Sequence, residues 1–89
     1  MTDYYVKKYP ELKEVVDKHN LKFDLDCWGM GVIVFYEGEE IGYWFQSLNG
    51  ISMQYTIGLG LHNDFHENYT LLSEGIDYRI NTSFNQMKS

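Results

Sequence analysis

The sequence contains one cysteine, one proline, one arginine and no alanine, and it has no long apolar run. A single thiol, Cys27, excludes an internal disulfide and a Cys-x-x-Cys site, so packing must supply the stability. No stretch approaches the roughly 18 to 20 apolar residues of a membrane helix. The opening MTDYYVKK also lacks the apolar core of a signal peptide. These absences predict a cytoplasmic protein.

Basic residues are scarce where carboxylates are frequent. Five of the seven Lys and Arg residues lie between Lys7 and Lys22, whereas residues 23–78 contain nine carboxylates and neither Lys nor Arg. Such a body would repel phosphates, which disfavours direct binding to nucleic acid. It suits a basic protein surface, although acidity also serves to keep a small aromatic-rich chain in solution. Scarce arginine and alanine beside plentiful Tyr, Lys, Asn and Ile indicate an AT-rich genome, such as that of a low-GC bacterium or its phage.

Length and periodicity predict one α+β domain over residues 1–89, with a polar tail at 83–89 that frays. We expect an N-terminal helix packed on a four- to five-stranded, mainly antiparallel meander sheet, with a short second helix before the last strand. Helix signals run from Asp3 to Asn20. Pro10 suits a first helical position, which favours either a short turn or a kink before it. Asn20 tolerates the left-handed conformation in which helices often end.

From Leu21 the apolar period changes from 3.6 to 2, which predicts a strand over residues 21–27 and a glycine-containing break at 28–31. Residues 32–57 are expected to form three strands joined at Gly38-Glu39 and Asn49-Gly50. A second helix is expected to begin with the capping box of Asp64 and Glu67 and to end at Gly75, with a hairpin strand at residues 69–72 as the alternative. Alternation at residues 76–80 predicts the last strand.

The two expected turns set the register, and register decides which side chains share a face of the sheet. If both turns have two residues, Trp44 lies in the core with Ile33, Phe35, Met53 and Tyr55. The opposite face then gathers a second apolar set: Val32, Val34, Tyr36, Ile41, Tyr43 and Phe45. Either the second helix or the chain termini cover this set, or it is the surface that meets a partner.

Candidate chemistry is weak in this sequence. Two imidazoles and a carboxylate at His62, Asp64 and His66 could bind zinc or iron if the segment is extended. Capping of a helix by Asp64 would occupy its carboxylate, so a metal-dependent enzyme is only an outside hypothesis. Cys27 reads as a small core residue, and the glycine pairs lack the context of phosphate-binding loops. We expect no enzymatic activity, no metal and no cofactor.

The leading hypothesis is a non-enzymatic, acidic protein-binding domain, of the kind that phages and mobile elements use as inhibitors. It would occupy a basic, nucleic-acid-binding surface of a target protein, where carboxylates imitate phosphates. The expected binding residues come from the second apolar set, without Val32, and from the acidic turn beside it: Val34, Tyr36, Glu37, Glu39, Glu40, Ile41, Tyr43 and Phe45. The alternative is a homo-oligomer that encloses a small ligand between paired sheet faces.

Overall fold

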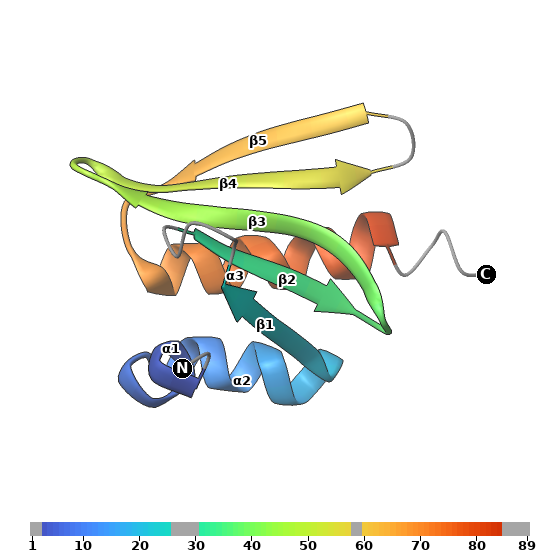
Figure 1. Ribbon diagram of the computed structural model, residues 1–89, viewed down its shortest axis with the longest axis horizontal. Coiled ribbons are helices and arrows are strands. Elements are labelled where there is room, and N and C mark those ends of the chain that lie inside the picture. The colour runs from blue at the N-terminus through green and yellow to red at the C-terminus, as the bar shows by residue number, and fades with distance from the viewer. Residues whose placement is uncertain (1–2, 26–30, 58–59, 85–89) are drawn as a thin grey trace.

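The computed structural model describes residues 3–25, 31–57 and 60–84, and it shows an α+β fold built on one antiparallel sheet (Figure 1). Five strands follow one another across the sheet in the order β1-β2-β3-β4-β5, which is a simple meander. The elements are α1 (Asp3–Lys8), α2 (Pro10–His19), β1 (Leu21–Leu25), β2 (Gly31–Tyr36), β3 (Glu39–Ser47), β4 (Gly50–Ile57), β5 (Gly60–His66), α3 (Tyr69–Arg79) and a π-helical turn, η1 (Ile80–Phe84). Cys27, residues 28–30 of the break expected after it and the end of the tail lie outside the described residues, while Gly31 begins β2.

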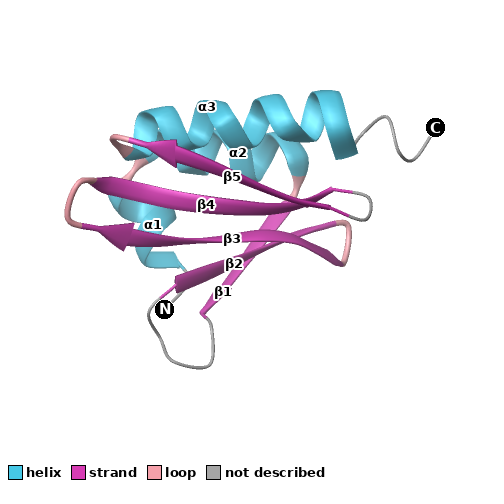
Figure 2. Cartoon of the chain, turned by 90° about the horizontal axis from the view of Figure 1, so that it is seen from above, coloured by secondary structure: helices cyan, strands magenta, loops and turns pink. Residues whose placement is uncertain are grey.

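All three α-helices lie on one side of the sheet (Figure 2). Helices α2 and α3 pack against each other as well as against the strands. No described helix or strand covers the opposite side of the sheet. The expected N-terminal helix and meander sheet are therefore confirmed, whereas the second helix follows the last strand and does not precede it.

The N-terminal helical segment breaks at Tyr9, as proline at the first position of α2 predicts. Tyr9 has an extended backbone, and Pro10 begins α2 without needing the N–H that it lacks. Asn20 ends the helix in the left-handed conformation, with φ of 54°. The chain then turns directly into β1, so the expected change of period at Leu21 is confirmed.

The second helix begins later than expected, and the strand expected at residues 76–80 is wrong. Asp64 lies within β5, and the side chain of Asn68 caps α3 by accepting a hydrogen bond from the Leu71 N–H at 2.9 Å. The buried residues Leu72, Ile76 and Ile80 are four apart, so they form one stripe of a helix. The same positions also satisfy the alternating pattern that predicted a strand.

The core lies between the helices and one face of the sheet. Trp44 at its centre is 1% exposed, and its ring meets Phe23 edge-on at 4.9 Å between centroids. The main buried residues that surround it are Leu12, Val15, Leu21, Val32, Val34, Tyr36, Ile41, Ile51, Met53, Tyr55, Tyr69, Leu72, Ile76 and Ile80. Where α2 meets α3, the His19 Nε2 atom lies 2.6 Å from a carboxylate oxygen of Asp77. This hydrogen bond lowers the pKa of Asp77.

Both hairpin turns lie one residue earlier than expected, and a bulge in β3 changes the faces. The first turn is Glu37-Gly38, where both residues have positive φ. Phe35 pairs with Glu40 but Val34 pairs with Gly42, so Ile41 is an extra residue on β3. A one-residue slip moves every following side chain to the other face. Val32 and Val34 therefore share Trp44's face, and the expectation that Ile33 and Phe35 lie in the core is wrong.

Gly42 is required at this bulge because its Cα faces the backbone of β4. A Cβ added at Gly42 would overlap the carbonyl oxygen of Gln54, which cannot swing aside as a side chain can. We expect Gly42→Ala to lower the free energy of unfolding by about 1 to 3 kcal/mol. Urea denaturation measures this loss, and Gly38→Ala, whose added Cβ meets nothing within 4 Å, separates steric overlap from the strain of a positive φ. Equal losses for the two variants would contradict the steric explanation.

Candidate partner-binding face

The side of the sheet opposite the helices, here called the open face, carries several large apolar side chains. Pairing across the strands places on it Lys22, Asp24, Ile33, Phe35, Glu40, Tyr43, Phe45, Ser52, Gln54, Thr56, Leu61, Asn63 and Phe65. The phenylalanine side chains of Phe45 and Phe65 are large and apolar, yet they are 42% and 54% exposed. A face of this kind, uncovered by the described elements, is where a partner can be bound.

A groove runs along β4 on the open face. Polar residues of β4 lie beside aromatic residues of β3, in the cross-strand rows Phe45, Ser52, Phe65 and Tyr43, Gln54, Asn63. The resulting hollow has a volume of about 310 Å³. The Tyr43 and Phe45 rings form one wall, with centroids 6.4 Å apart and planes 26° apart. The groove therefore combines aromatic walls with a floor of hydroxyl and amide groups.

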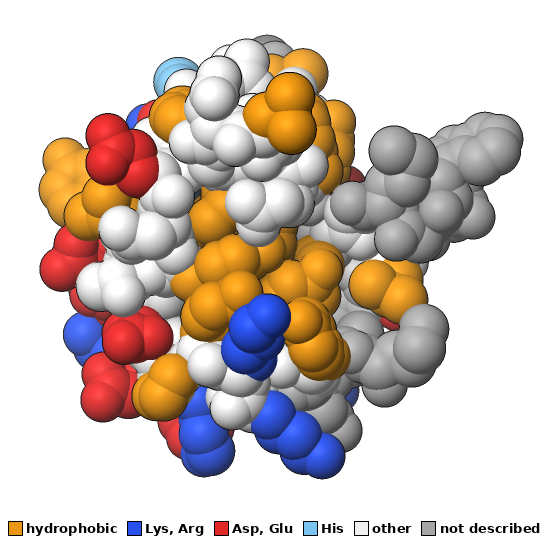
Figure 3. Space-filling model, turned by 90° about the vertical axis from the view of Figure 1, so that its left-hand side faces the viewer, with side chains coloured by type: hydrophobic (Ala, Val, Ile, Leu, Met, Phe, Trp, Pro, Cys, Tyr) orange, Lys and Arg blue, Asp and Glu red, His pale blue; other side chains and the backbone are white. Residues whose placement is uncertain are grey.

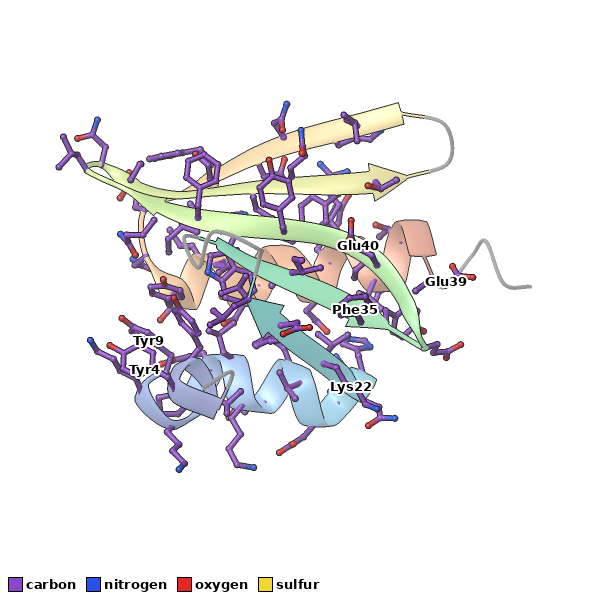
Figure 4. All side chains as sticks on the ribbon, in the orientation of Figure 1. Tyr4, Tyr9, Lys22, Phe35, Glu39 and Glu40 are labelled. Atoms are coloured by element: carbon purple, nitrogen blue, oxygen red, sulfur yellow. The ribbon has the colours of Figure 1, made fainter. Side chains whose placement is uncertain are left out.

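Carboxylates gather at one end of the sheet, where β2 turns into β3. Glu37, Glu39 and Glu40 are all exposed there, and the open-face position of Glu40 is next to Phe35. Figure 4 shows Glu39 and Glu40 near Phe35 and Lys22, at the opposite end of the molecule from Tyr4 and Tyr9. Lys22 is the only Lys or Arg in the described strands. The electrostatic potential at this end of the open face is therefore negative.

The structure divides the expected binding residues into two groups. Tyr43, Phe45, Glu37, Glu39 and Glu40 reach the surface on or beside the open face. The other three, Val34, Tyr36 and Ile41, are at most 8% exposed and lie in the core under the helices. The expectation that they share a face with Tyr43 and Phe45 is wrong because of the bulge at Ile41.

Four aromatic or aliphatic residues of the open face were not expected there, and one of them is Leu61 of β5. Ile33 and Phe35 occupy the positions on β2 that Val34 and Tyr36 were expected to fill, and Phe65 forms the far wall of the groove. The available signal was Gly42, because glycine within a strand often marks a bulge. The place of Phe65 on the open face is not predicted because the capping box of Asp64 and Glu67 indicates the start of a helix there.

The suggested metal ligands lie on the helix side of β5, where α3 contacts Asp64 and His66 while His62 is exposed. His62, Asp64 and His66 pair with core residues of β4, so they share one face as the extended reading requires. The guanidinium of Arg79 donates two hydrogen bonds to Asp64, at 3.1 and 3.2 Å. Within the residues that the structure describes, no three His, Cys, Asp or Glu side chains gather closely enough to hold a metal ion.

His66 lies against α3, and this contact predicts a dependence of stability on pH. Its ring occupies the space beside Gly75, and burial lowers its pKa while Asp64 and Arg79 act on it in opposite directions. Because the pKa of His66 is lower in the folded state, its contribution to stability is fully present above its pKa in the unfolded chain, near 6.5. This contribution is lost as the pH falls through its pKa in the folded state. The lowered pKa of Asp77 acts separately, below about pH 4.

We therefore expect the melting temperature to fall between pH 7 and pH 5, and His66→Gln to remove part of this fall. Thermal melts of both proteins across this range measure the difference. The exposed His62→Gln, melted at a submicromolar protein concentration, is the matched control on the same strand face. A fall of equal size in His66→Gln and in the unchanged protein would show that burial of His66 does not cause it.

The helical layer carries most of the positive charge. Figure 3 shows apolar side chains gathered on the end of the molecule where α1 lies, with Lys side chains along one border and carboxylates along another. Here the Tyr9 and Tyr69 rings stack with centroids 4.0 Å apart, and the Lys8 Nζ atom lies 5.4 Å from the centre of the Tyr4 ring. The Lys residues of α1 give this end of the helical layer positive charge, although the three α-helices together carry more carboxylates than Lys and Arg residues.

Comparison with protein-family models, with curated proteins and with solved structures finds no match to this chain. None of the helices in the described ranges is long and apolar enough to cross a membrane.

Proposed function

We propose that this chain is a protein-binding domain whose open face docks on a basic surface of a target protein. The observation that carries the proposal is a sheet face with exposed aromatic residues at its centre and carboxylates at one end, left uncovered by the described elements. Aromatic residues are enriched in protein interfaces because they offer large contact areas at low cost in conformational entropy.

The groove along β4 gives this face a site for a partner's side chain. Its volume of about 310 Å³ is at the small end for ligand pockets, which fits an anchoring side chain better than a cofactor. Ser52, Gln54 and Asn63 provide hydroxyl and amide groups to it. Such groups bind a partner's polar atoms, while Phe45 and Phe65 contribute apolar contact.

The carboxylates define the chemistry of the partner. Glu37, Glu39 and Glu40 would attract Lys and Arg from a distance and would repel acidic proteins and nucleic acid. Spaced carboxylates beside aromatic rings resemble, in charge, the phosphates beside bases of a nucleic acid. A basic nucleic-acid-binding protein is the partner class that this surface fits. A cytoplasmic inhibitor made by a phage or mobile element would use such a surface to block a nucleic-acid-binding protein.

A capture experiment with defined competitors tests the proposal. The immobilised domain is exposed to a nuclease-treated lysate of a low-GC bacterium, at low and at high salt and with duplex DNA added. We expect a basic partner that high salt or DNA releases and that Glu39→Gln/Glu40→Gln binds less well. The matched control, Glu11→Gln/Glu14→Gln, removes the same charge from α2 and should retain the partner. Capture that ignores salt, DNA and Glu39/Glu40 would overturn the proposal.

A further inference from the structure

Strand β5 leaves one edge of the sheet open for pairing. It is the last of the five strands, and no other described strand lies beyond it (Figure 1). Its seven residues contain no proline, lysine or arginine, the residues that natural proteins use to block pairing at exposed edges. An edge of this kind can add another antiparallel strand.

Exposed apolar side chains concentrate around this edge on both sides of the sheet. Leu61 and Phe65 lie on the open face of β5 and are 63% and 54% exposed. On the helix side, Leu71 and Tyr78 are 40% and 63% exposed, and they lie four residues before and three after Gly75, which faces His66 of β5. These four are a majority of the seven large hydrophobic residues that are exposed in the described chain. Large exposed apolar groups in one place mark an interaction site.

The charge at this edge is more favourable for docking of a second copy than the charge at the acidic end of the sheet. The single carboxylate of β5, Asp64, is paired with Arg79, whose guanidinium also lies 5.3 Å from the centre of the Tyr55 ring. The edge is therefore close to neutral in a chain of net charge −6. Two copies that meet here avoid the repulsion that would arise between two sets of Glu37, Glu39 and Glu40.

We propose that the chain forms a two-fold symmetric homodimer through antiparallel pairing of β5 with β5 of a second copy. With Asn63 on the two-fold axis, Leu61 lies opposite Phe65 of the second copy, and Phe65 lies opposite Leu61. On the helix side, His62 lies opposite the Asp64 carboxylate of the second copy, which can accept a hydrogen bond from the imidazole. The strand is thus complementary to itself, as a two-fold interface requires.

This pairing joins two five-stranded sheets into one continuous sheet. Both open faces then point to the same side, and both α3 helices lie on the other side with Leu71 and Tyr78 near the second copy. A pairing of seven residues belongs to the small interfaces, below about 1,200 Å² of buried surface, so we expect a dissociation constant on the order of micromolar. The dimer is independent of the proposed basic partner.

A charge exchange on β5 tests both the dimer and its register in the purified full chain. Sedimentation velocity from about 1 to about 500 µM should show a monomer that becomes a dimer. Leu61→Lys/Phe65→Lys places Lys opposite Lys and should raise the dissociation constant at least tenfold. Leu61→Lys/Phe65→Glu places Lys opposite Glu at both positions and should restore the dimer. Leu48→Lys, at an exposed hairpin tip, should leave the dimer unchanged.

Several outcomes would overturn this inference. The first is a monomer at every concentration, which would leave the edge to a strand from another protein. The second is a dimer whose dissociation constant Leu61→Lys/Phe65→Lys does not raise. The third is a Leu61→Lys/Phe65→Glu variant that circular dichroism shows to be folded but that does not form the dimer. Loss of the captured basic partner would not bear on this result, because sedimentation is measured on the chain alone.

Discussion

Replacing Trp44 with alanine should lower the free energy of unfolding by about 3 to 5 kcal/mol. The indole is almost fully buried and meets aromatic rings from three other elements, namely Phe23 on β1, Tyr5 on α1 and Tyr69 on α3. Alanine would leave a cavity where the helical layer meets the sheet, and the rings around it could fill that cavity only in part. Urea denaturation followed by circular dichroism measures the loss.

The neighbours of Trp44 along β3 provide the control. Tyr43 and Phe45 point to the open face, so Phe45→Ala should cost less than about 1 kcal/mol of stability. The contrast between adjacent positions depends only on which face each side chain occupies. If Phe45→Ala lowers stability as much as Trp44→Ala does, the open face is covered in solution and cannot be a docking surface.

Local patterns in the sequence were sufficient to predict most elements of this fold. Pro10 and Asn20 give the limits of α2, and the change from helical to alternating period occurs at Leu21, as observed. The two hairpins were expected within one residue of their real positions. For the second hairpin this small error leaves the faces unchanged, because the register moves by two residues and Trp44 stays on the side of Met53 and Tyr55.

The first hairpin shows why the candidate site was only partly predictable. The turn alone fixes pairing near Tyr36, but the extra residue at Ile41 reverses the faces beyond it. Whether a strand contains a bulge depends on contacts with its neighbours, here the close approach of Gly42 to the backbone of β4. Tyr43 and Phe45 lie on the face opposite Trp44, as expected. The β2 residues beside them are Ile33 and Phe35, each one position before the expected Val34 and Tyr36.

The elements of the C-terminal third were predicted wrongly for a different reason. Short apolar patterns at residues 60–80 fit both a strand and a helix, and only tertiary contacts distinguish them. The hydrogen bonds between Asp64 and Arg79 join β5 to α3 across 15 residues, and no local rule indicates that pairing. Because β5 was read as a helix start, neither the groove wall at Phe65 nor the open edge of the sheet was predicted.

Tyr43→Ala/Phe45→Ala should weaken binding of the basic partner by about 100-fold or more while the domain stays folded. Central aromatic residues of interfaces commonly contribute 2 kcal/mol or more each, and about 1.4 kcal/mol corresponds to a factor of ten. Both side chains are on the surface, and together they form one wall of the groove. Titration calorimetry with the captured partner measures the dissociation constant.

Surface plasmon resonance with the same partner, at low and at high salt, separates the aromatic contribution from the electrostatic one, because it measures the rates of association and dissociation. Neutralising Glu39 and Glu40, at the rim, should mainly slow association and reduce its salt dependence, whereas removing the rings should accelerate dissociation and leave the salt dependence in place. Val34→Ala is the matched core variant, because Val34 belongs to the neighbouring strand but is fully buried. It should lower stability without changing the affinity of the folded fraction. An affinity that Tyr43→Ala/Phe45→Ala leaves unchanged would mean that the partner binds elsewhere.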